Sequence, residues 1–264
     1  MALSAMRGVS LTTGNPLTLV GCIAEIWRYP VSSVGGEAIP SANLSPVGVA
    51  GDRRYGLIDV STGLPAAPEK DHRWRPALYL QAKCVCGTLP TLFFPNGQAY
   101  PLNDRLLNGV LSDYFGFATA VATYDYAERQ FDLPLIHHRN RHFPMHLLTT
   151  ASLSRLATLQ QVNAIDSRRF RPSVLIETGE TEGFLEDGWM ARRLRLGAIE
   201  LTVRERTKRC GMTFMSQPSL NVEPEILRNI LRYNKRHLGI YCSIENTGTI
   251  HVGDKLFILN RFRA

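Results

Sequence analysis

The sequence predicts a mainly β protein with a few helices. Short segments that alternate apolar and polar residues recur along the 264 residues, and glycine, proline or asparagine separates most of them. Strands of this length and spacing are typical of a β-barrel or a β-sandwich. Three segments have helical character instead, at residues 106–115, about 150–162 and 223–233.

The first half is predicted to be a series of strands. The opening strand begins at residue 17 and ends at Pro30. Between residues 125 and 143 the pattern weakens, and three histidines in this segment invite a metal-site interpretation. We favour a solvated loop between two domains, because no helical or strand register brings the histidines together. The further strands of this half are predicted at 37–44, 54–60, 78–85, 92–94, 98–102 and 118–124.

The second half begins with a strand that leads into a helix. Thr149 or Thr150 is the predicted N-cap of this helix, because a hydroxyl there accepts a bond from the first turn. The helix at 223–233 has acidic residues first and basic residues last, as the helix dipole favours. The other strands are predicted at 173–177, 193–196, 198–203, 241–245 and 255–259.

The composition excludes several classes of protein. A hydrophobic fraction of 44% with 20% charged residues is typical of a globular chain of one or two domains. The formal net charge of +7 favours an anionic ligand such as a phosphate. No stacking motif of aromatic and basic residues accompanies this charge, so we expect no nucleic acid partner.

The cysteines and the apolar runs indicate where the protein resides. The five cysteines are an odd number and form no CxxC pair, which disfavours a disulfide framework and a zinc knuckle and favours a reducing compartment. No run approaches the roughly 18 apolar residues that cross a membrane. The first 15 residues lack a continuous apolar core, so we interpret them as a loose leader. We therefore expect a cytoplasmic protein without a membrane partner.

Cys210 is the candidate reactive residue. It follows two cations, Lys208 and Arg209, just after the predicted strand at 198–203. Neighbouring cations favour the thiolate, which is the form that attacks substrates and binds metals. On local sequence alone, a half-buried structural cysteine is an equally good interpretation.

Motifs in both halves, taken in order, resemble those of MOSC domain proteins. The first half is similar to the β-barrel domain that precedes MOSC in proteins of the amidoxime-reducing component type. The resemblance implies an N-terminal β-barrel domain at 17–125 packed on a β-barrel MOSC domain at 126–262, with a few peripheral helices. The matching residues of the first half are Tyr29-Pro30-Val31, Ser33, Gly51-Asp52-Arg53-Arg54-Tyr55, Asp59 and Gly63; those of the second half are Phe170-Arg171-Pro172, Glu186-Asp187, Trp189, Leu196-Gly197, Arg209-Cys210, Thr213, Tyr241, Glu245-Asn246, Gly248-Thr249-Ile250 and Val252-Gly253-Asp254.

The resemblance implies a molybdenum–molybdopterin cofactor with Cys210 as the metal ligand and catalytic residue. Molybdenum accepts soft thiolate ligands, and arginines suit an anionic phosphate. Asp187 and Trp189 are expected to support the site by hydrogen bonding and packing. The implied cofactor-binding residues are Ser33, Arg53, Arg171, Ser173, Lys208, Arg209 and Tyr241.

Two of these assignments have structural alternatives. Arg53 could instead pair with Asp52 or Asp59, and Arg171 could pair with a glutamate of residues 180–186. The chain also departs from the family pattern. Ser32 stands where the amidoxime reducers usually carry lysine, Ser173 stands where they carry asparagine, and residues 216–221 lack their Asp-Pro-x-x-Gly segment. These departures leave the substrate open.

By resemblance, the protein is a molybdenum-dependent oxidoreductase that reduces small N-hydroxylated or N-oxide substrates. The chain carries no flavin, haem or iron–sulfur signature, so electrons would come from separate ferredoxin-, flavin- or cytochrome-type proteins. The alternative is a carrier of the molybdenum cofactor, or a sulfur-transfer protein that uses a Cys210 persulfide.

Overall fold

The computed structural model describes residues 17–84, 89–124, 133–137 and 143–259. The leader at 1–15, Cys86 and two of the three clustered histidines, His138 and His142, lie outside the described residues.

Seven strands close into a barrel. β1 is hydrogen-bonded to β16 on one side and to β11 on the other, so the sheet returns to its starting strand. Register shifts between Leu19 and Gly21 and between Ile23 and Glu25 let this long strand curve around the barrel. In order around the barrel the strands are β1 (Leu17–Arg28), β11 (Val174–Glu177), β10 (Met145–Thr149), β14 (His237–Ile244), β13 (Ile199–Lys208), β12 (Arg193–Leu196) and β16 (Lys255–Leu259).

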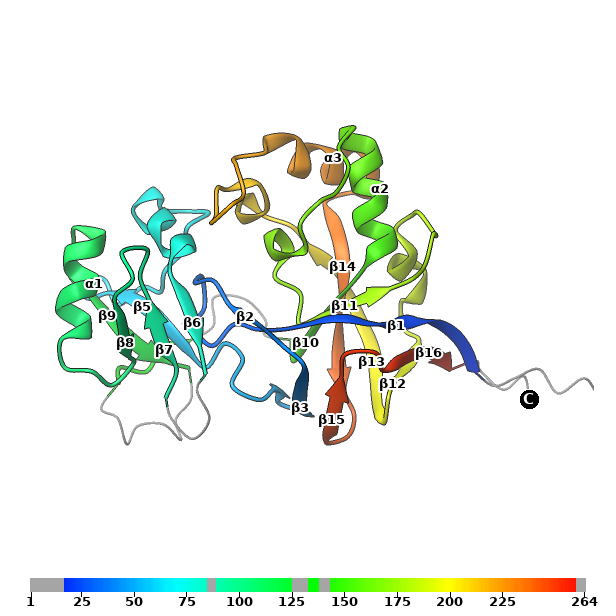
Figure 1. The fold of residues 1–264 in the computed structure, drawn as a ribbon, viewed down its shortest axis with the longest axis horizontal. Coiled ribbons are helices and arrows are strands. Elements are labelled where there is room, and N and C mark those ends of the chain that lie inside the picture. The colour runs from blue at the N-terminus through cyan, green and yellow to red at the C-terminus, as the bar shows by residue number, and fades with distance from the viewer. Residues whose placement is uncertain (1–16, 85–88, 125–132, 138–142, 260–264) are drawn as a thin grey trace, which may run out of the picture.

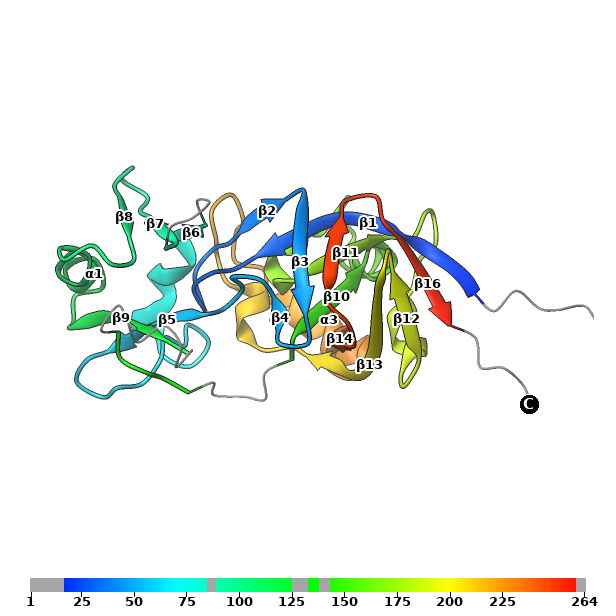
Figure 2. The same cartoon turned by 90° about the horizontal axis from the view of Figure 1, so that it is seen from below.

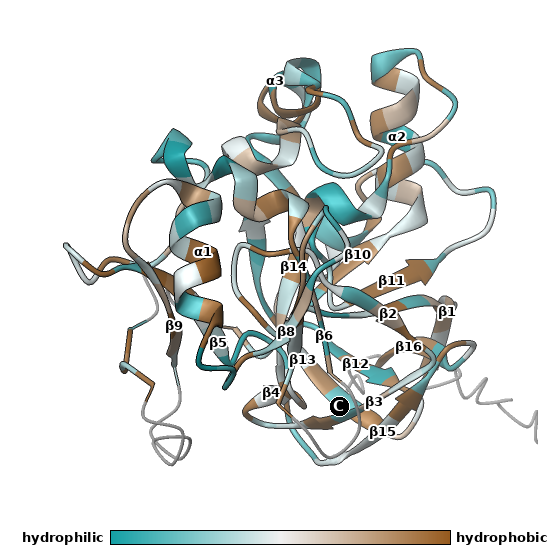
Figure 3. Ribbon diagram, turned by 60° about the vertical axis from the view of Figure 1, so that its left-hand side comes forward, coloured by the Kyte–Doolittle hydropathy of each residue, from teal (hydrophilic) through white to brown (hydrophobic). Residues whose placement is uncertain are grey.

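Inward-facing aliphatic side chains fill the barrel. Alternate residues of β13, namely Ile199, Leu201 and Val203, are buried and belong to one apolar cluster with residues of the other barrel strands. Two helices, α2 (Thr150–Gln160) and α3 (Pro224–Asn234), lie beside one another at one end of the barrel (Figure 1). α3 is amphipathic, as its alternating colours show in Figure 3, and it buries Ile226 and Ile230.

The rest of the first half forms small sheets beside the barrel (Figures 1 and 2). Trp74 is buried in the apolar core of this half and makes edge contacts with Phe115 and Phe117. The strands are β2 (Glu37–Ile39) on β1, β3 (Ser41–Ser45) between β4 (Gly48–Val49) and β15 (Gly248–His251), β5 (Tyr55–Asp59) with β9 (Thr119–Thr123), and β7 (Thr91–Phe93) between β6 (Gln81–Lys83) and β8 (Ala99–Pro101); the helices are α1 (Leu107–Phe115) and the 3₁₀ segment η1 (His72–Tyr79).

The mainly β fold with a barrel and peripheral helices is confirmed, and some elements differ from expectation. The strand predicted at 78–85 is wrong at its start, because η1 continues to Tyr79; of the described part of this range, residues 78–84, Gln81–Lys83 forms a strand. The strand predicted at 37–44 breaks at Pro40, which lacks a backbone donor. β15 was not expected, since its residues lie between glycines.

The domain boundaries at 17–125 and 126–262 stay a prediction. The structure adds that β1, from the first half, completes the barrel whose other six strands come from the second half. No helix among the described residues is long and apolar enough to cross a membrane.

Candidate functional site

Cys210 lies at the end of the barrel that faces the first half. β13 continues to Lys208, further than predicted, and Cys210 directly precedes the 3₁₀ segment η5 (Gly211–Phe214). The thiol is half-buried and forms no disulfide. An ideal Cβ on Gly211 would lie 3.7 Å from Cβ of Glu69, so the first half approaches the chain next to Cys210.

Arg209 is buried and turned into the protein. Its Nε and Nη2 both donate to the carbonyl oxygen of Leu238, at 2.8 and 2.6 Å, and Nη1 donates to that of Phe170 at 3.0 Å. Burial lowers the pKa of Arg209 to about 10, which leaves it charged at neutral pH. Arg209 therefore braces the chain beside Cys210 and has little capacity left for a ligand.

His146, on β10, connects Arg209 to Arg171. Nη2 of Arg209 donates to Nε2 of His146 at 2.6 Å, which requires Nδ1 to carry the proton. Nδ1 lies 3.3 Å from the carbonyl oxygen of Arg171 and donates to it. Burial, and secondarily the charge of Arg209, hold the pKa of His146 well below its usual value of 6.5. The histidine is therefore neutral.

Gly239 makes the contact between Arg209 and His146 possible. Its φ is +79°, and a Cβ there would lie 2.6 Å from Nε2 of His146 and 2.8 Å from the carbonyl oxygen of Leu147. Only glycine fits this position without displacing the bond.

Arg171 carries a buried donor without a partner. Its Nη1 donates to the carbonyl oxygen of Val34 at 2.7 Å, whereas Nη2 is buried and has no hydrogen-bond partner. The guanidinium lies 4.1 Å from the centre of the Tyr29 ring. Burial lowers the pKa of Arg171 to about 10, so the guanidinium stays charged at neutral pH although it has no carboxylate partner among the described residues. Glu186, one alternative partner, accepts from Thr149 and Ser152 instead.

Arg53 joins the same cluster from the first half. Its Nη2 donates to the carbonyl oxygen of Arg171 at 3.0 Å, and Nη1 pairs with Asp52, as one alternative for this residue anticipated. Burial opposes the charge of Arg53, but Asp52 outweighs it and raises the arginine pKa. Asp52 also accepts from the backbone N–H of Tyr29 at 2.6 Å.

The other predicted cofactor-binding residues differ in their exposure and in their contacts. Tyr241, on β14, stacks on Phe143 with ring centres 4.9 Å apart and lies 5.4 Å from the His146 ring. Lys208 is exposed at the end of β13. Ser33 donates to the carbonyl oxygen of Ala66, and Ser173 accepts from the backbone N–H of His146, so both hydroxyls already have partners within the protein.

Asp187 and Trp189 lie on the 3₁₀ segment η4 (Leu185–Trp189). Trp189 packs in the barrel core. Asp187 lies 3.7 Å from Arg206, and its Oδ1 is buried without a hydrogen-bond partner. The supporting role expected of the two residues stays a prediction.

Hydrogen bonds and one ion pair thus join Asp52, Arg53, Arg171, His146 and Arg209, and Arg209 directly precedes Cys210 in the sequence. Sequence reasoning missed His146, Gly239 and Glu69. One of them could have been suspected from the sequence: Gly239 is a glycine within an otherwise continuous strand, which often marks a special backbone conformation, and its φ is positive.

The residues present fit a metal held mainly by a non-protein ligand. Within the described part of the chain, no three His, Cys, Asp or Glu side chains converge to hold a metal ion. A single thiolate at Cys210 can complete a coordination sphere whose other ligands come from a pterin dithiolene. The buried Nη2 of Arg171 offers an unused donor to an anionic group.

A β-barrel with a half-buried thiol next to the buried Arg209, and with two partly buried arginines nearby, defines a candidate cofactor-binding protein. The MOSC domain model matches residues 134–257, and the model of the MOSC N-terminal beta barrel domain matches residues 20–84. The chain belongs to the MOSC domain proteins that carry this N-terminal domain.

One protein is similar to this chain in sequence, and another is similar in fold. Mitochondrial amidoxime reducing component 2 of Homo sapiens is 23% identical over 289 aligned positions, which cover 91% of this chain and 84% of that protein. The crystal structure of the YUAD protein from Bacillus subtilis is 10% identical and superposes with a TM-score of 0.50, covering 93% of this chain and 98% of that one. The second likeness bears on the fold alone.

Proposed function

We propose that the protein is a molybdenum–molybdopterin-dependent reductase of small N-hydroxylated or N-oxide compounds. The observation that carries this proposal is the free thiol of Cys210 directly after Arg209, where a hydrogen-bonded series of arginines and His146 ends; one of these arginines, Arg171, has an unused donor. The likeness to an amidoxime reducing component supports the reaction class.

The bound cofactor would supply two-electron chemistry with transfer of an oxygen atom. The residues of this chain hold and orient it. Cys210 binds the metal as a thiolate, and Arg171 donates from Nη2 to an anionic group. Arg53 and His146 donate to the carbonyl oxygen of Arg171. Arg209 donates to the carbonyl oxygens of Phe170 and Leu238 and so fixes the backbone of both segments.

Lys208 and Tyr241 lie at the rim of this site. Tyr241 stands beside His146 and presents an aromatic ring and a hydroxyl, which suit a flat heterocycle. Lys208 adds an exposed positive charge two residues from Cys210. Ser33 and Ser173 support the site indirectly, because their hydroxyls bond the backbone groups of Ala66 and His146.

A basic surface beside Cys210 suits an acidic electron-transfer protein. Lys208 faces His237 in the strand register, and Lys235 lies two residues before His237. Both lysines are exposed, and neither has an ion-pair partner within the described ranges. We therefore propose this surface as the docking site of a separate ferredoxin-, flavin- or cytochrome-type donor.

Replacing Cys210 with serine tests the proposal. The variant should fold normally, lose its molybdenum and lose reduction of a hydroxylamine by an artificial electron donor. Cys22→Ser, which removes another half-buried free thiol of the barrel, is the control and should keep both. Metal analysis and turnover of the purified proteins give the result.

Two outcomes would contradict this function. A Cys210→Ser protein with full metal content and turnover would exclude Cys210 as the ligand. Metal-free wild-type protein that accepts labelled sulfur on Cys210 would instead indicate the sulfur-transfer role.

A further inference from the structure

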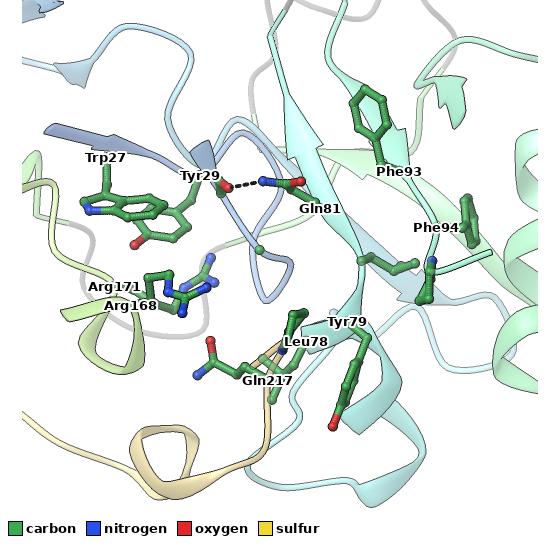
Figure 4. A pocket seen from close by; sticks show the side chains of 15 residues that line it. Trp27, Tyr29, Leu78, Tyr79, Gln81, Phe93, Phe94, Arg168, Arg171 and Gln217 are labelled. Carbon is green, nitrogen blue, oxygen red and sulfur yellow. Dashed lines mark hydrogen bonds between the residues drawn. The ribbon is translucent and has the colours of Figure 1, made fainter. Parts of the chain in front are cut away.

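A cavity of about 370 Å³ lies where the first half meets the barrel (Figure 4). Its lining comes from the end of β1, from η1 and β6, from β7 and the turn after it, from η3 (Ser167–Phe170) and the residue that follows it, and from the loop after Cys210. Of the predicted cofactor residues, only Arg171 lines it, whereas Ser33, Arg53, Cys210 and Tyr241 do not. The cavity is therefore a neighbour of the candidate cofactor site.

The walls of the cavity are largely flat and apolar. Trp27 and Tyr29 are nearly parallel, with ring centres 6.0 Å apart, and they form one wall. Phe93 and Phe94 stand across the cavity, and Leu78 lies between the two sides in Figure 4. Facing aromatic and aliphatic surfaces suit a planar ring.

The polar groups of the lining favour an anion. Two arginines, Arg168 and Arg171, lie side by side below the Trp27–Tyr29 wall, and no lining residue carries a carboxylate. Asp166 holds Arg168 through its Nε and Nη2, at distances of 2.7 to 3.1 Å, and so fixes its orientation. Arg171 has no carboxylate partner, and its Nη2 is buried without a hydrogen bond.

Other carboxylates nearby already have partners. Glu25 accepts from Nε1 of Trp27 at 2.6 Å and from Ser167 at 2.8 Å. Two uncharged groups also remain available. The hydroxyl of Tyr29 is buried without a hydrogen-bond partner, and the side chain of Gln217 makes no hydrogen bond to the described residues.

We propose that this cavity is a second ligand site, which binds a flat aromatic compound carrying a carboxylate. The ring would lie between the Trp27–Tyr29 wall and Phe93. The carboxylate would accept from Arg168, and the positive charge of Arg171 beside it would add attraction, while Nη2 of Arg171 stays assigned to the cofactor. This site shares the charge of Arg171 with the candidate cofactor site, but it needs no bound cofactor.

The probe that tests the site is 2-naphthoate, with 2-naphthamide and acetate as its uncharged and ring-free counterparts. Calorimetry on the full purified chain should show saturable binding of one 2-naphthoate, with each counterpart at least about tenfold weaker. Trp27 is half-buried, whereas Trp74 and Trp189 are buried, so binding should also quench tryptophan fluorescence, and Trp27→Phe should remove the quench.

Variants locate the probe. Arg168→Gln and Gln217→Ala should each weaken 2-naphthoate binding, the former by about tenfold because it removes a charged donor. The second variant lies in a loop and keeps the measurement valid if the first one unfolds. Cys210→Ser and Tyr241→Phe lie outside the cavity and should leave binding unchanged.

Three results would overturn the proposal. They are the absence of saturable binding, equal affinity for 2-naphthamide, and a loss of binding in Cys210→Ser that matches the loss in Arg168→Gln. The last result would place the probe in the candidate cofactor site instead.

Discussion

Arg209 donates to Nε2 of His146 across 2.6 Å, and this bond fixes the protonation of both residues. The arginine keeps its proton, and the histidine must stay neutral at Nε2 to accept. The pair lies between the candidate metal ligand and the carbonyl oxygen of Arg171. A change in the charge of His146 would therefore disturb the whole chain of contacts.

The first prediction concerns pH. The folded-state pKa of His146 is well below 6.5, whereas the unfolded chain binds a proton near its usual value. Stability from the neutral histidine is thus complete above about pH 6.5 and falls as the pH drops below it, by at most about 1.4 kcal/mol per pH unit. Urea unfolding at pH 7.5, 6.0 and 5.0 measures this slope.

His146→Gln should flatten that dependence, because glutamine does not titrate. The matched control is His251→Gln at an exposed position, which should keep the wild-type slope. An unchanged slope in the His146 variant would show that other groups cause the acid sensitivity.

The second prediction separates two arginines of the site. Arg171→Met removes a partly buried cation that has no carboxylate partner but leaves one carbonyl oxygen, that of Val34, without its donor, so the free energy of unfolding of the apoprotein should fall by only about 1 kcal/mol. Arg209→Met leaves two buried carbonyl groups without their donor and should cost more than about 3 kcal/mol. Denaturant titration of both variants makes the comparison.

The third prediction concerns cofactor retention. Arg171→Met should lower molybdenum occupancy by about tenfold, because a charged donor to an anionic group is lost. Arg171→Lys keeps the charge and should lose less. Metal analysis of protein from parallel expressions gives the ratio, and equal occupancy in all three proteins would remove Arg171 from the cofactor site.

The fourth prediction concerns Gly239. Gly239→Ala forces a methyl group to within 2.6 Å of Nε2 of His146 at a φ of +79°, so it should destabilise the protein by at least about 2 kcal/mol. Gly253→Ala is the matched control, since its φ is +93° and nothing lies within 4 Å of an added Cβ. That variant should cost only the backbone strain, about 1 kcal/mol.

The fifth prediction concerns the basic surface. Lys208→Gln combined with Lys235→Gln should slow reduction by an acidic donor protein and weaken its dependence on ionic strength. Turnover with a small artificial donor should not change. Lys255→Gln, an exposed lysine of β16, is the control, and an equal effect from it would mean that only net charge matters.

The sequence predicted those elements that carry a clear local signal, such as an alternation of apolar and polar residues or a helix cap. β12 and β16 have the predicted bounds, and Thr149 caps α2 by accepting from the backbone N–H of Ser152. β15 could not be predicted in this way, because it pairs with β3 some 200 residues earlier in the chain. From the local sequence alone, the glycines at 248 and 253 predict a turn.

In the candidate site, too, some features follow from the local sequence and others depend on distant segments. The cations before Cys210 are visible in the sequence, and so is the basic character of the chain. The inward turn of Arg209 is not, because it depends on carbonyl groups of two other segments, at Phe170 and Leu238. His146 was missed because a single polar residue in an apolar strand gives no sign of its partners.

The closure of the barrel by β1 has a consequence for how the chain folds. Strand β1 is made before the other barrel strands, yet its two partners in the barrel begin at Val174 and Lys255, and only its last residues pair early, with β2. During synthesis most of its backbone groups therefore stay unpaired, and its apolar face stays open to other molecules, until most of the chain has been made. Such long-range pairing is slow to form, so we expect the last step of folding to be the insertion of β1 between β11 and β16.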